Sequence, residues 1–594
     1  MADVEALAGE LPEAKEGSRQ HAVAKEMGLG ATYERKVALV NREIRAMGFG
    51  KFQWALTLLS GGGWAVDNII FYALSISLPQ IEREFGSSTP VQFQTLALYV
   101  GLLVGATFWG LGSDIIGRRA SWNLTLLIGS VFMLSVGAAP TFAAMGCLLA
   151  CTGVGVGGNL PVDGMLLLEF TPGSKQWVVT LLSVFWSFGQ LFATVIGWAF
   201  ITNYSCIEKD PEGLQPCLKA DNMGWRYTFY LCGGFTLLLW VARFFVYPVP
   251  ESPKYLIARG RDEEAIEVLN FIAKENKTKN NLTLQLLREM SDCDDTGRTT
   301  TEIIAATVIG SNASGEDCGA EERKTDTMGK ADDDVIKENV CEEKTASRPA
   351  PLSAPSESGP TKKAKGSRIG FSQSDWQQVK SSATHFDRAH LKLLVASRKM
   401  ALNTFIIVFC WSCLGLAYPL YNAFIAIYVE QASANLSSQP QSQSEQYRQL
   451  VYFSLCSIPG CLLATVLVEL PRIGRRGAMA FFTLLTGIFL FGFTTARTTN
   501  AVLGWNCGAS FVQNAAYAVL YAITYELFPT PARGTGDGIA MASQRVFGLA
   551  PPIIAAYAGK DNPSTPVFVS ASLFVAASIV MLFLPFEPRG LESM

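Results

Sequence analysis

The sequence predicts an all-helical membrane protein with twelve transmembrane helices arranged in two six-helix halves. Apolar stretches long enough to cross a bilayer recur along the 594 residues, and one charged pattern occurs twice. Gly117-Arg118-Arg119 precedes Glu169 by 52 residues counted from the glycine, and Gly474-Arg475-Arg476 precedes Glu526 by the same 52. A unit repeated on either side of a midpoint is typical of membrane proteins built from two related halves.

The composition fits a membrane protein and excludes several other classes. Hydrophobic residues make up 49% of the chain, and the net charge of −3 comes with no basic stripe, so we expect no nucleic-acid partner. All three histidines lie in polar segments, and the thirteen cysteines show no metal-ligand spacing. We therefore expect no catalytic residues, no metal site and no cofactor. The N-terminus has no apolar core and does not resemble a cleaved signal.

Each span is placed by its hydrophobicity, since a bilayer core about 30 Å thick needs roughly 20 helical residues. Six apolar segments precede a polar middle, at about 52–80, 93–112, 120–139, 142–168, 178–201 and 225–248. Six follow it, at about 400–429, 450–470, 477–495, 501–528, 537–558 and 565–586. The predicted parts are a tail (1–51), the N-terminal half (52–248), a polar loop (249–399), the C-terminal half (400–586) and a second tail (587–594).

Positive charge orients these spans, because loops rich in Arg and Lys stay in the cytosol. One face carries most of them, so we expect both tails and the loop 249–399 to be cytosolic in a plasma-membrane protein. The loop is largely too polar to fold, apart from a short helix expected at Arg261 to Leu269. Asn203 and Asn435 begin glycan-acceptor patterns on the outer face. Cys206 and Cys217 share an outer loop, where a disulfide or free thiols both remain open.

The first copy of the repeated pattern predicts a gate. Glu169, at the cytosolic end of span four, can accept a charge-assisted hydrogen bond from Arg118 or Arg119. Such a bond would lock the helices when the cytosolic side is closed and break when that side opens. The alternative is that the arginines only anchor the topology.

Several motifs resemble those of the major facilitator superfamily. The loop from Gly110 to Arg119 is similar to its loop signature, and the segments around Glu251 and Glu587 resemble the motifs that follow its sixth and twelfth spans. The second-half loop is degraded, with Pro471 where an aspartate would stand. The resemblance implies gating roles for a set of charged residues: Asp114, Arg118, Arg119, Glu169, Glu251, Arg475, Arg476, Glu526, Arg533 and Glu587.

Within this superfamily the chain looks closest to the synaptic-vesicle-protein-related transporters. The segments 48–54, 157–164 and 533–536 carry that resemblance. It implies secondary transport but not a substrate. Span five lacks the Gly-Pro pair of drug/proton antiporters, and span seven lacks the hexose-binding pattern of sugar porters.

Three ionisable side chains are expected inside the bilayer, where a charge costs about 2.5–3.5 kcal/mol even on lenient scales. Asp67, in span one, is the first candidate for proton coupling, and Asp163, in span four, is the second. For each, the alternative is a static ion pair with Arg545 of span eleven. Arg545 itself could bind an anionic solute or serve only in such a pair.

Polar and aromatic residues of the spans are candidates to line a central cavity: Trp64, Asn68, Trp186, Gln190, Trp411, Tyr418, Tyr421, Asn422, Asn514, Tyr517 and Arg545. The alternative for each aromatic residue is simple packing. Gly153, Gly155, Gly157 and Gly158 in span four should let helices approach closely. No strand precedes these glycines, so nucleotide binding is rejected.

The leading hypothesis is a monomeric secondary carrier that moves a small polar or anionic organic solute, with protons, by alternating access. An exporter working by proton antiport is one rival, and a nutrient sensor that does not transport is another. No constellation of side chains suggests an enzyme.

Overall fold

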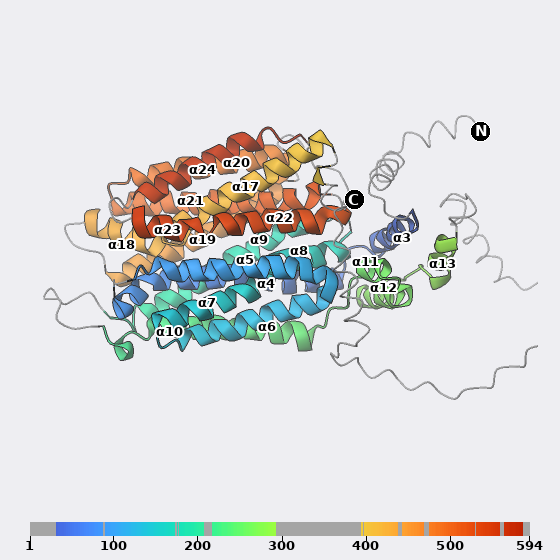
Figure 1. The fold of residues 1–594 in the computed structure, drawn as a ribbon, viewed down its shortest axis with the longest axis horizontal. Coiled ribbons are helices and arrows are strands. Elements are labelled where there is room, and N and C mark those ends of the chain that lie inside the picture. Colours follow the sequence, from blue (N-terminus) through green and yellow to red (C-terminus); the bar gives the residue numbers. More distant parts are fainter. Residues whose placement is uncertain are drawn as a thin grey trace, which may run out of the picture. The chain divides into compact units, whose positions relative to one another are not determined.

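The computed structural model describes residues 31–86, 89–172, 175, 177–206, 217–292, 394–395, 397–436, 442–468, 474–528, 530–558 and 564–585. Within these residues every regular element is a helix, so the predicted all-helical class is confirmed (Figure 1). Most of the predicted loop 249–399 and both chain ends fall outside the described residues.

The N-terminal half contains six membrane-crossing units. They are α4 (Lys51–Phe85), α5 (Gln92–Ile116), α6 (Arg118–Gly137), α7 (Phe142–Val156) with α8 (Asn159–Phe170), α9 (Trp177–Ile201), and α10 (Gly224–Val241) with the π-helical turn η3 (Ala242–Val246). Span four breaks between α7 and α8 at its glycines. A Cβ on Gly153 would collide with the backbone of α5, and one on Gly155 with the backbone of α6. The predicted close approach at these glycines is therefore confirmed.

The C-terminal half repeats this arrangement. Its units are α17 (Arg398–Asn422) with α18 (Ile425–Leu436), α19 (Gln443–Val468), α20 (Gly474–Thr494), α21 (Thr499–Leu527), α22 (Thr530–Phe547) with α23 (Ala550–Ala558), and α24 (Thr565–Met581). All twelve predicted spans thus coincide with a helix or with a pair of consecutive helices. The repeated glycines Gly117 and Gly474 both have positive φ, 105° and 65°, so the duplicated sequence pattern also has a similar backbone conformation.

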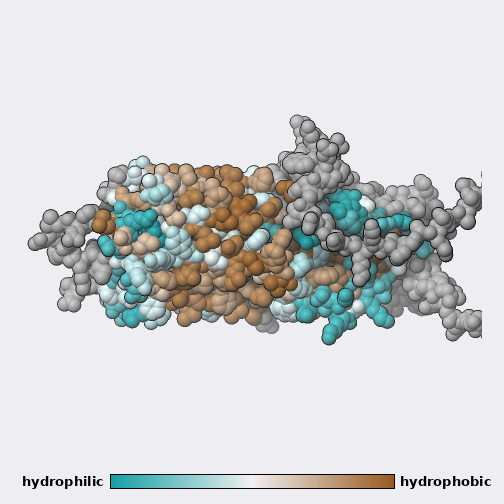
Figure 2. Space-filling view, turned by 90° about the horizontal axis from the view of Figure 1, so that it is seen from below, coloured by the Kyte–Doolittle hydropathy of each residue, from teal (hydrophilic) through white to brown (hydrophobic). Residues whose placement is uncertain are grey.

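The surface is that of a membrane protein. On the face drawn in Figure 2, a hydrophobic band crosses the helical bundle, with hydrophilic residues at both ends. Among the described residues, nine helical segments are long and apolar enough to cross a membrane. The other three spans are α4, α21 and the 17-residue α24. Helices α4 and α21 turn many polar side chains inward, including Asp67, Asn68 and Gln513, which lowers their mean hydropathy.

The two halves pack through equivalent spans. Span five (α9) lies against span eight (α19), and span two (α5) lies against span eleven (α22). This pairing is the one that a pseudo-twofold relation between the halves requires. We call the end with Arg118 and Arg476 the arginine end, and the end with Cys206 and Cys217 the disulfide end.

Four short helices extend beyond the bundle at the arginine end: α3 (Ala31–Met47), α11 (Pro253–Ala258), α12 (Asp262–Asn276) and α13 (Leu284–Asp292) (Figure 1). The sequence predicted only α12, and as a shorter helix. Lys36 of α3 forms an ion pair with Asp262 of α12 at 2.5 Å. Asn276 then accepts the backbone N–H of Phe52 at 3.0 Å, so the end of α12 caps the start of span one.

Candidate functional site

An ion pair joins the two halves in the middle of the bundle. Arg545 Nη2 of α22 lies 3.5 Å from Asp67 Oδ1 of α4, and the two side chains are only 7% and 8% exposed. Removing two charges from water is costly, and a long contact of this kind returns only part of that cost. Arg545 also keeps a buried Nε with no hydrogen-bond partner among the described residues. The pair is therefore well placed to exchange partners.

This ion pair lines a small cavity to which three helices of each half contribute. The lining residues are Asp67, Asn68, Ile70, Phe71, Leu98, Tyr99, Leu102, Trp186, Tyr418, Tyr521, Gln544 and Arg545. The cavity offers about 20 Å³ to the centre of a water-sized sphere, room for one or two waters. An organic solute can enter only if the halves move apart.

Four of the predicted cavity residues line it, namely Asn68, Trp186, Tyr418 and Arg545, together with Asp67, the first candidate for proton coupling. Trp186 stacks on Tyr418 with ring centres 5.7 Å apart. The sequence reasoning missed Phe71, Tyr99, Tyr521 and Gln544. Helical spacing could have found two of them, because Phe71 follows Asp67 by four residues and Tyr521 follows Tyr517 by four.

The remaining predicted residues do not line the cavity. Trp64 and Trp411 each pack on Tyr521 with ring centres 4.8 Å apart, and Tyr517 packs on Trp186 at 5.3 Å. These three support the aromatic wall from behind. Three polar members form hydrogen bonds outside the cavity: Tyr421 with Asn506, Asn422 with Tyr72 and Gln513, and Asn514 with the Ser510 carbonyl. The side-chain amide of Gln190 has no hydrogen-bond partner among the described residues.

A second buried ion pair lies wholly within the N-terminal half, and here one sequence expectation was wrong. Asp163 pairs with Arg243 of η3, at 3.1 Å, and not with Arg545. Arg243 was not recognised as a buried charge because it lies in the last turn of span six, where the sequence resembles an interfacial anchor. The two side chains are 0% and 1% exposed.

Arg243 gathers three other helices around this contact. It donates to the Leu59 carbonyl of α4 at 2.8 Å and to the Trp122 carbonyl of α6 at 3.2 Å, and it lies 4.3 Å from the centre of the Trp122 ring. Gly63 of α4 leaves the space for the pair, since a Cβ there would overlap Asp163 Oδ2 and the guanidinium. A charge with this many fixed partners acts as a static brace.

At the arginine end, Arg118 forms an ion pair with Glu169. Glu251 accepts the backbone N–H groups of Arg118 and Arg119, at 3.1 and 3.3 Å, and thereby caps the start of α6. Burial raises the pKa of the Glu251 carboxyl, against the opposing effect of its backbone hydrogen bonds. This turn needs a glycine at Gly117 for two reasons: its φ is positive, and a Cβ would lie 2.9 Å from Glu251 Oε2.

The other predicted gating residues are only partly described. Arg475 is buried, and Arg476 donates to the Leu584 carbonyl at 3.1 Å. The side chains of Asp114, Glu526 and Arg533, and all of Glu587, lie outside the described residues.

At the disulfide end, the open question about the two loop cysteines is answered: Cys206 and Cys217 are bonded, with Cα atoms 6.0 Å apart. Asn203, three residues earlier, is exposed, as a glycan acceptor must be. The side chain of Asn435 lies outside the described residues.

Comparisons with known proteins agree with this fold. The family described as "Sugar (and other) transporter" matches residues 52–303. The chain is 39% identical to "MFS siderochrome iron transporter 1" of Ceriporiopsis subvermispora, over 95% of this chain and 93% of that protein. It is 24% identical to the bovine "Synaptic vesicle 2-related protein", over 97% and 87%. The solved proton:xylose symporter XylE matches 91% of this chain and 98% of its own, with 15% identity and a TM-score of 0.58.

Proposed function

The chain belongs to the major facilitator superfamily, as a multi-pass membrane transporter of the sugar and organic-solute type, and from this premise we propose that it carries a small polar or anionic organic solute together with protons. The observation that carries the proposal is the pair Asp67–Arg545 at the midplane cavity. One charge comes from each half, so movement of the halves alters the pair directly.

The pair offers a route from solute binding to proton binding. A carboxylate or other anionic group of a solute can take the place of Asp67 beside Arg545, whose Nε has no hydrogen-bond partner among the described residues. Asp67 then loses its cation and takes up a proton, because an unpaired buried carboxylate is costly. Solute and proton thus enter together. The aromatic walls of Phe71, Trp186 and Tyr418 suit the apolar part of such a solute.

The complete cavity forms within one chain, which supports transport by a monomer. We place both termini in the cytosol, with the arginine end inward, at the plasma membrane. Arg118–Glu169 then acts as part of the inner gate. Helices α3 and α12 lie on the cytosolic side in this orientation.

The experiment that tests the proposal is a transport screen in proteoliposomes, in both directions, with and without a pH gradient. The panel contains monocarboxylates, dicarboxylates, sugars, an organic cation and a ferric siderochrome, the last because one relative is named for it. Accumulation driven by an inward proton gradient supports the proposal. Solute efflux driven by that gradient favours the antiport exporter. Thermal stabilisation by a solute without any flux favours the sensor.

The orientation predicts which positions an impermeant thiol reagent reaches in intact cells. Arg118→Cys and Arg475→Cys should stay unlabelled, because both lie at the arginine end. Asn500→Cys, at an exposed position in the first turn of α21, should be labelled above the level of the parent chain. Labelling of Arg118→Cys from outside would reverse the proposed orientation.

The inner gate predicts the behaviour of Glu169→Gln. The variant loses the ion pair between Glu169 and Arg118, whose two side chains are 15% and 18% exposed. Because the pair is partly exposed, we expect expression to persist and solute exchange to slow about two- to fivefold. Glu264→Gln removes an exposed carboxylate of α12 and serves as the matched control. Exchange rates equal to the parent in both variants would remove Glu169 from the gate.

A further inference from the structure

We infer that Arg83 and Glu430 form the gate that closes the solute path at the disulfide end, and that the Cys206–Cys217 bond keeps Arg83 within reach of Glu430. The inference rests on the alternating access of the proposed function but concerns residues far from the cavity. None of these residues is part of the repeated charged pattern.

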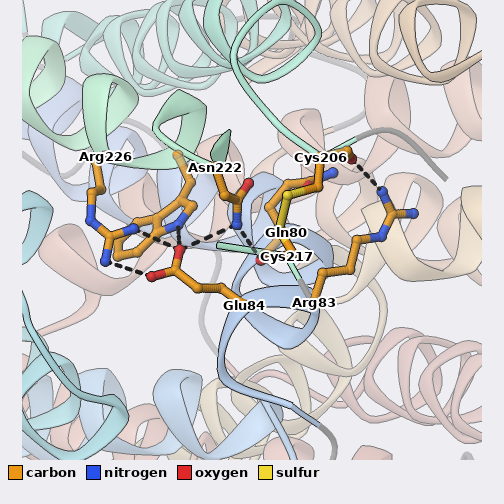
Figure 3. The surroundings of a disulfide bond; sticks show 8 residues. Gln80, Arg83, Glu84, Cys206, Cys217, Asn222 and Arg226 are labelled. Atoms are coloured by element: carbon orange, nitrogen blue, oxygen red, sulfur yellow. Dashed lines mark hydrogen bonds and ion pairs between the residues drawn. A yellow bond between two sulfur atoms is a disulfide. The ribbon is translucent and has the colours of Figure 1, made fainter. Parts of the chain in front are cut away.

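The contacts of Arg83 join three segments. Its Nη2 lies 2.5 Å from Glu430 Oε1 of α18, in the other half, and its Nη1 donates to the Cys206 carbonyl at 3.4 Å. Figure 3 shows the guanidinium pointing from α4 toward the carbonyl of the bonded cysteine. One acceptor of the guanidinium thus belongs to a disulfide-bonded cysteine of the same half, and another belongs to the opposite half.

The next residue along α4 has a different task. Glu84 accepts from Arg226 at 2.7 and 2.8 Å and from Trp225 at 2.9 Å, all within the N-terminal half (Figure 3). Arg226 and Glu84 are 1% and 7% exposed, which makes this pair costly to break. Arg83 and Glu430 are 25% and 27% exposed, so their pair is cheap to break. A gate between two rigid halves needs a contact across the halves that breaks easily. It also needs its own helix to be held firmly within one half, and the Glu84–Arg226 pair does this.

Arg83 stands at the end of a series of cross-half contacts that begins beside the cavity. Tyr72 and Ser75 of α4 bond to Asn422 of α17 at 3.2 and 2.9 Å. Tyr447 of α19 donates to the Ile76 carbonyl at 2.8 Å. At 1.5 Å of rise per residue, Arg83 lies about 24 Å along α4 from Asp67. The gate is thus a separate closure, about half the length of α4 away from the cavity.

A small pocket adjoins the gate. It lies between α4, α18 and α19 and is lined by Arg83, Glu430, Gln80 and Tyr447, among others. Gln80 is 1% exposed, and its Oε1 has no hydrogen-bond partner among the described residues. Separation of Arg83 from Glu430 would open this polar pocket to solvent.

The test measures the fraction of molecules open at the disulfide end, by single-molecule fluorescence transfer between non-canonical amino acids at Lys219 and Ser442. The full chain is placed in nanodiscs without solute, so the result does not depend on whether transport is proton-coupled. Glu430→Gln and Arg83→Gln should each raise the open-to-closed ratio about two- to fivefold, and the double variant no further. Reduction of the disulfide should raise the ratio in the parent chain but not in Glu430→Gln.

The control is Glu445→Gln, which removes a carboxylate of α19 at the same end that pairs with Arg448 of its own helix and accepts the backbone N–H of Ser442. A ratio unchanged in Glu430→Gln, or raised equally in Glu445→Gln, would overturn the inference. A reduction effect that persists in Glu430→Gln would overturn the role of the disulfide. If single variants fold poorly, the double variant Arg83→Glu with Glu430→Arg tests the inference instead. This variant swaps the two charges, so a gate should regain the open-to-closed ratio of the parent chain.

Discussion

Asp67→Asn should abolish accumulation of solute against its gradient while leaving exchange of solute down its own gradient. An amide cannot gain and lose a proton, so the proton gradient no longer drives net uptake. Exchange needs only binding at the cavity and movement of the halves, and Asn68, Trp186 and Tyr418 remain there. Gradient-driven uptake and exchange should be measured side by side in proteoliposomes.

The static alternative makes a different prediction for the same residue. If Asp67 only neutralises Arg545, its loss leaves a buried cation unpaired, which costs about 3–5 kcal/mol. Folding or all transport would then fail together, and Asp67→Asn with Arg545→Gln would restore part of both. Undiminished pH-driven accumulation by Asp67→Asn would remove this residue from the coupling step.

Arg243→Gln should destabilise the protein far more than the loss of any exposed ion pair. The change leaves the fully buried Asp163 without its cation and removes the donors to the Leu59 and Trp122 carbonyls. Breaking one side of such a pair costs about 3–5 kcal/mol, so the melting temperature in detergent should fall by several degrees. Arg261→Gln, which breaks an exposed pair with Glu264, should stay within about one degree of the parent.

Two further variants separate a brace from a proton site at Asp163. Gly63→Ala should destabilise the protein, because its methyl group would overlap the pair, whereas Gly62→Ala should not, since its nearest neighbour is the flexible Leu239 side chain at 3.5 Å. Asp163→Asn with Arg243→Gln should recover most of the stability and retain proton coupling. Loss of coupling in that stable double variant would mean that Asp163, and not Asp67 alone, carries the proton.

The fold was readable because its signals are local and repeated. Twelve apolar segments give the spans, and the duplicated glycine-arginine pattern gives the two halves. Helices α3, α11 and α13 escaped prediction, because they pack against one another and against α12 rather than forming a long apolar run. Only the membrane segments of this chain produce a continuous hydrophobic signal.

The site was readable in part, for a geometric reason. Sequence shows that Asp67, Asp163 and Arg545 lie in spans, but the partner of each depends on how a helix is rotated about its axis. Asp67 does face Arg545, whereas Asp163 faces Arg243, which looks like an interfacial anchor in the sequence. Arg226 likewise carries no sign of burial in the sequence, yet its side chain is 1% exposed beside Glu84. Burial of a charge at a helix end has no periodic signature.

The most direct test of the central claim is the movement of protons caused by solute alone. Proteoliposomes are loaded with a pH-sensitive dye, and a gradient of the solute identified by the screen is imposed without a pH gradient. The parent chain should acidify the compartment that the solute enters, and Asp67→Asn should move solute by exchange with no pH change. Net solute entry by the parent chain without any change of pH would contradict proton coupling at the Asp67–Arg545 pair.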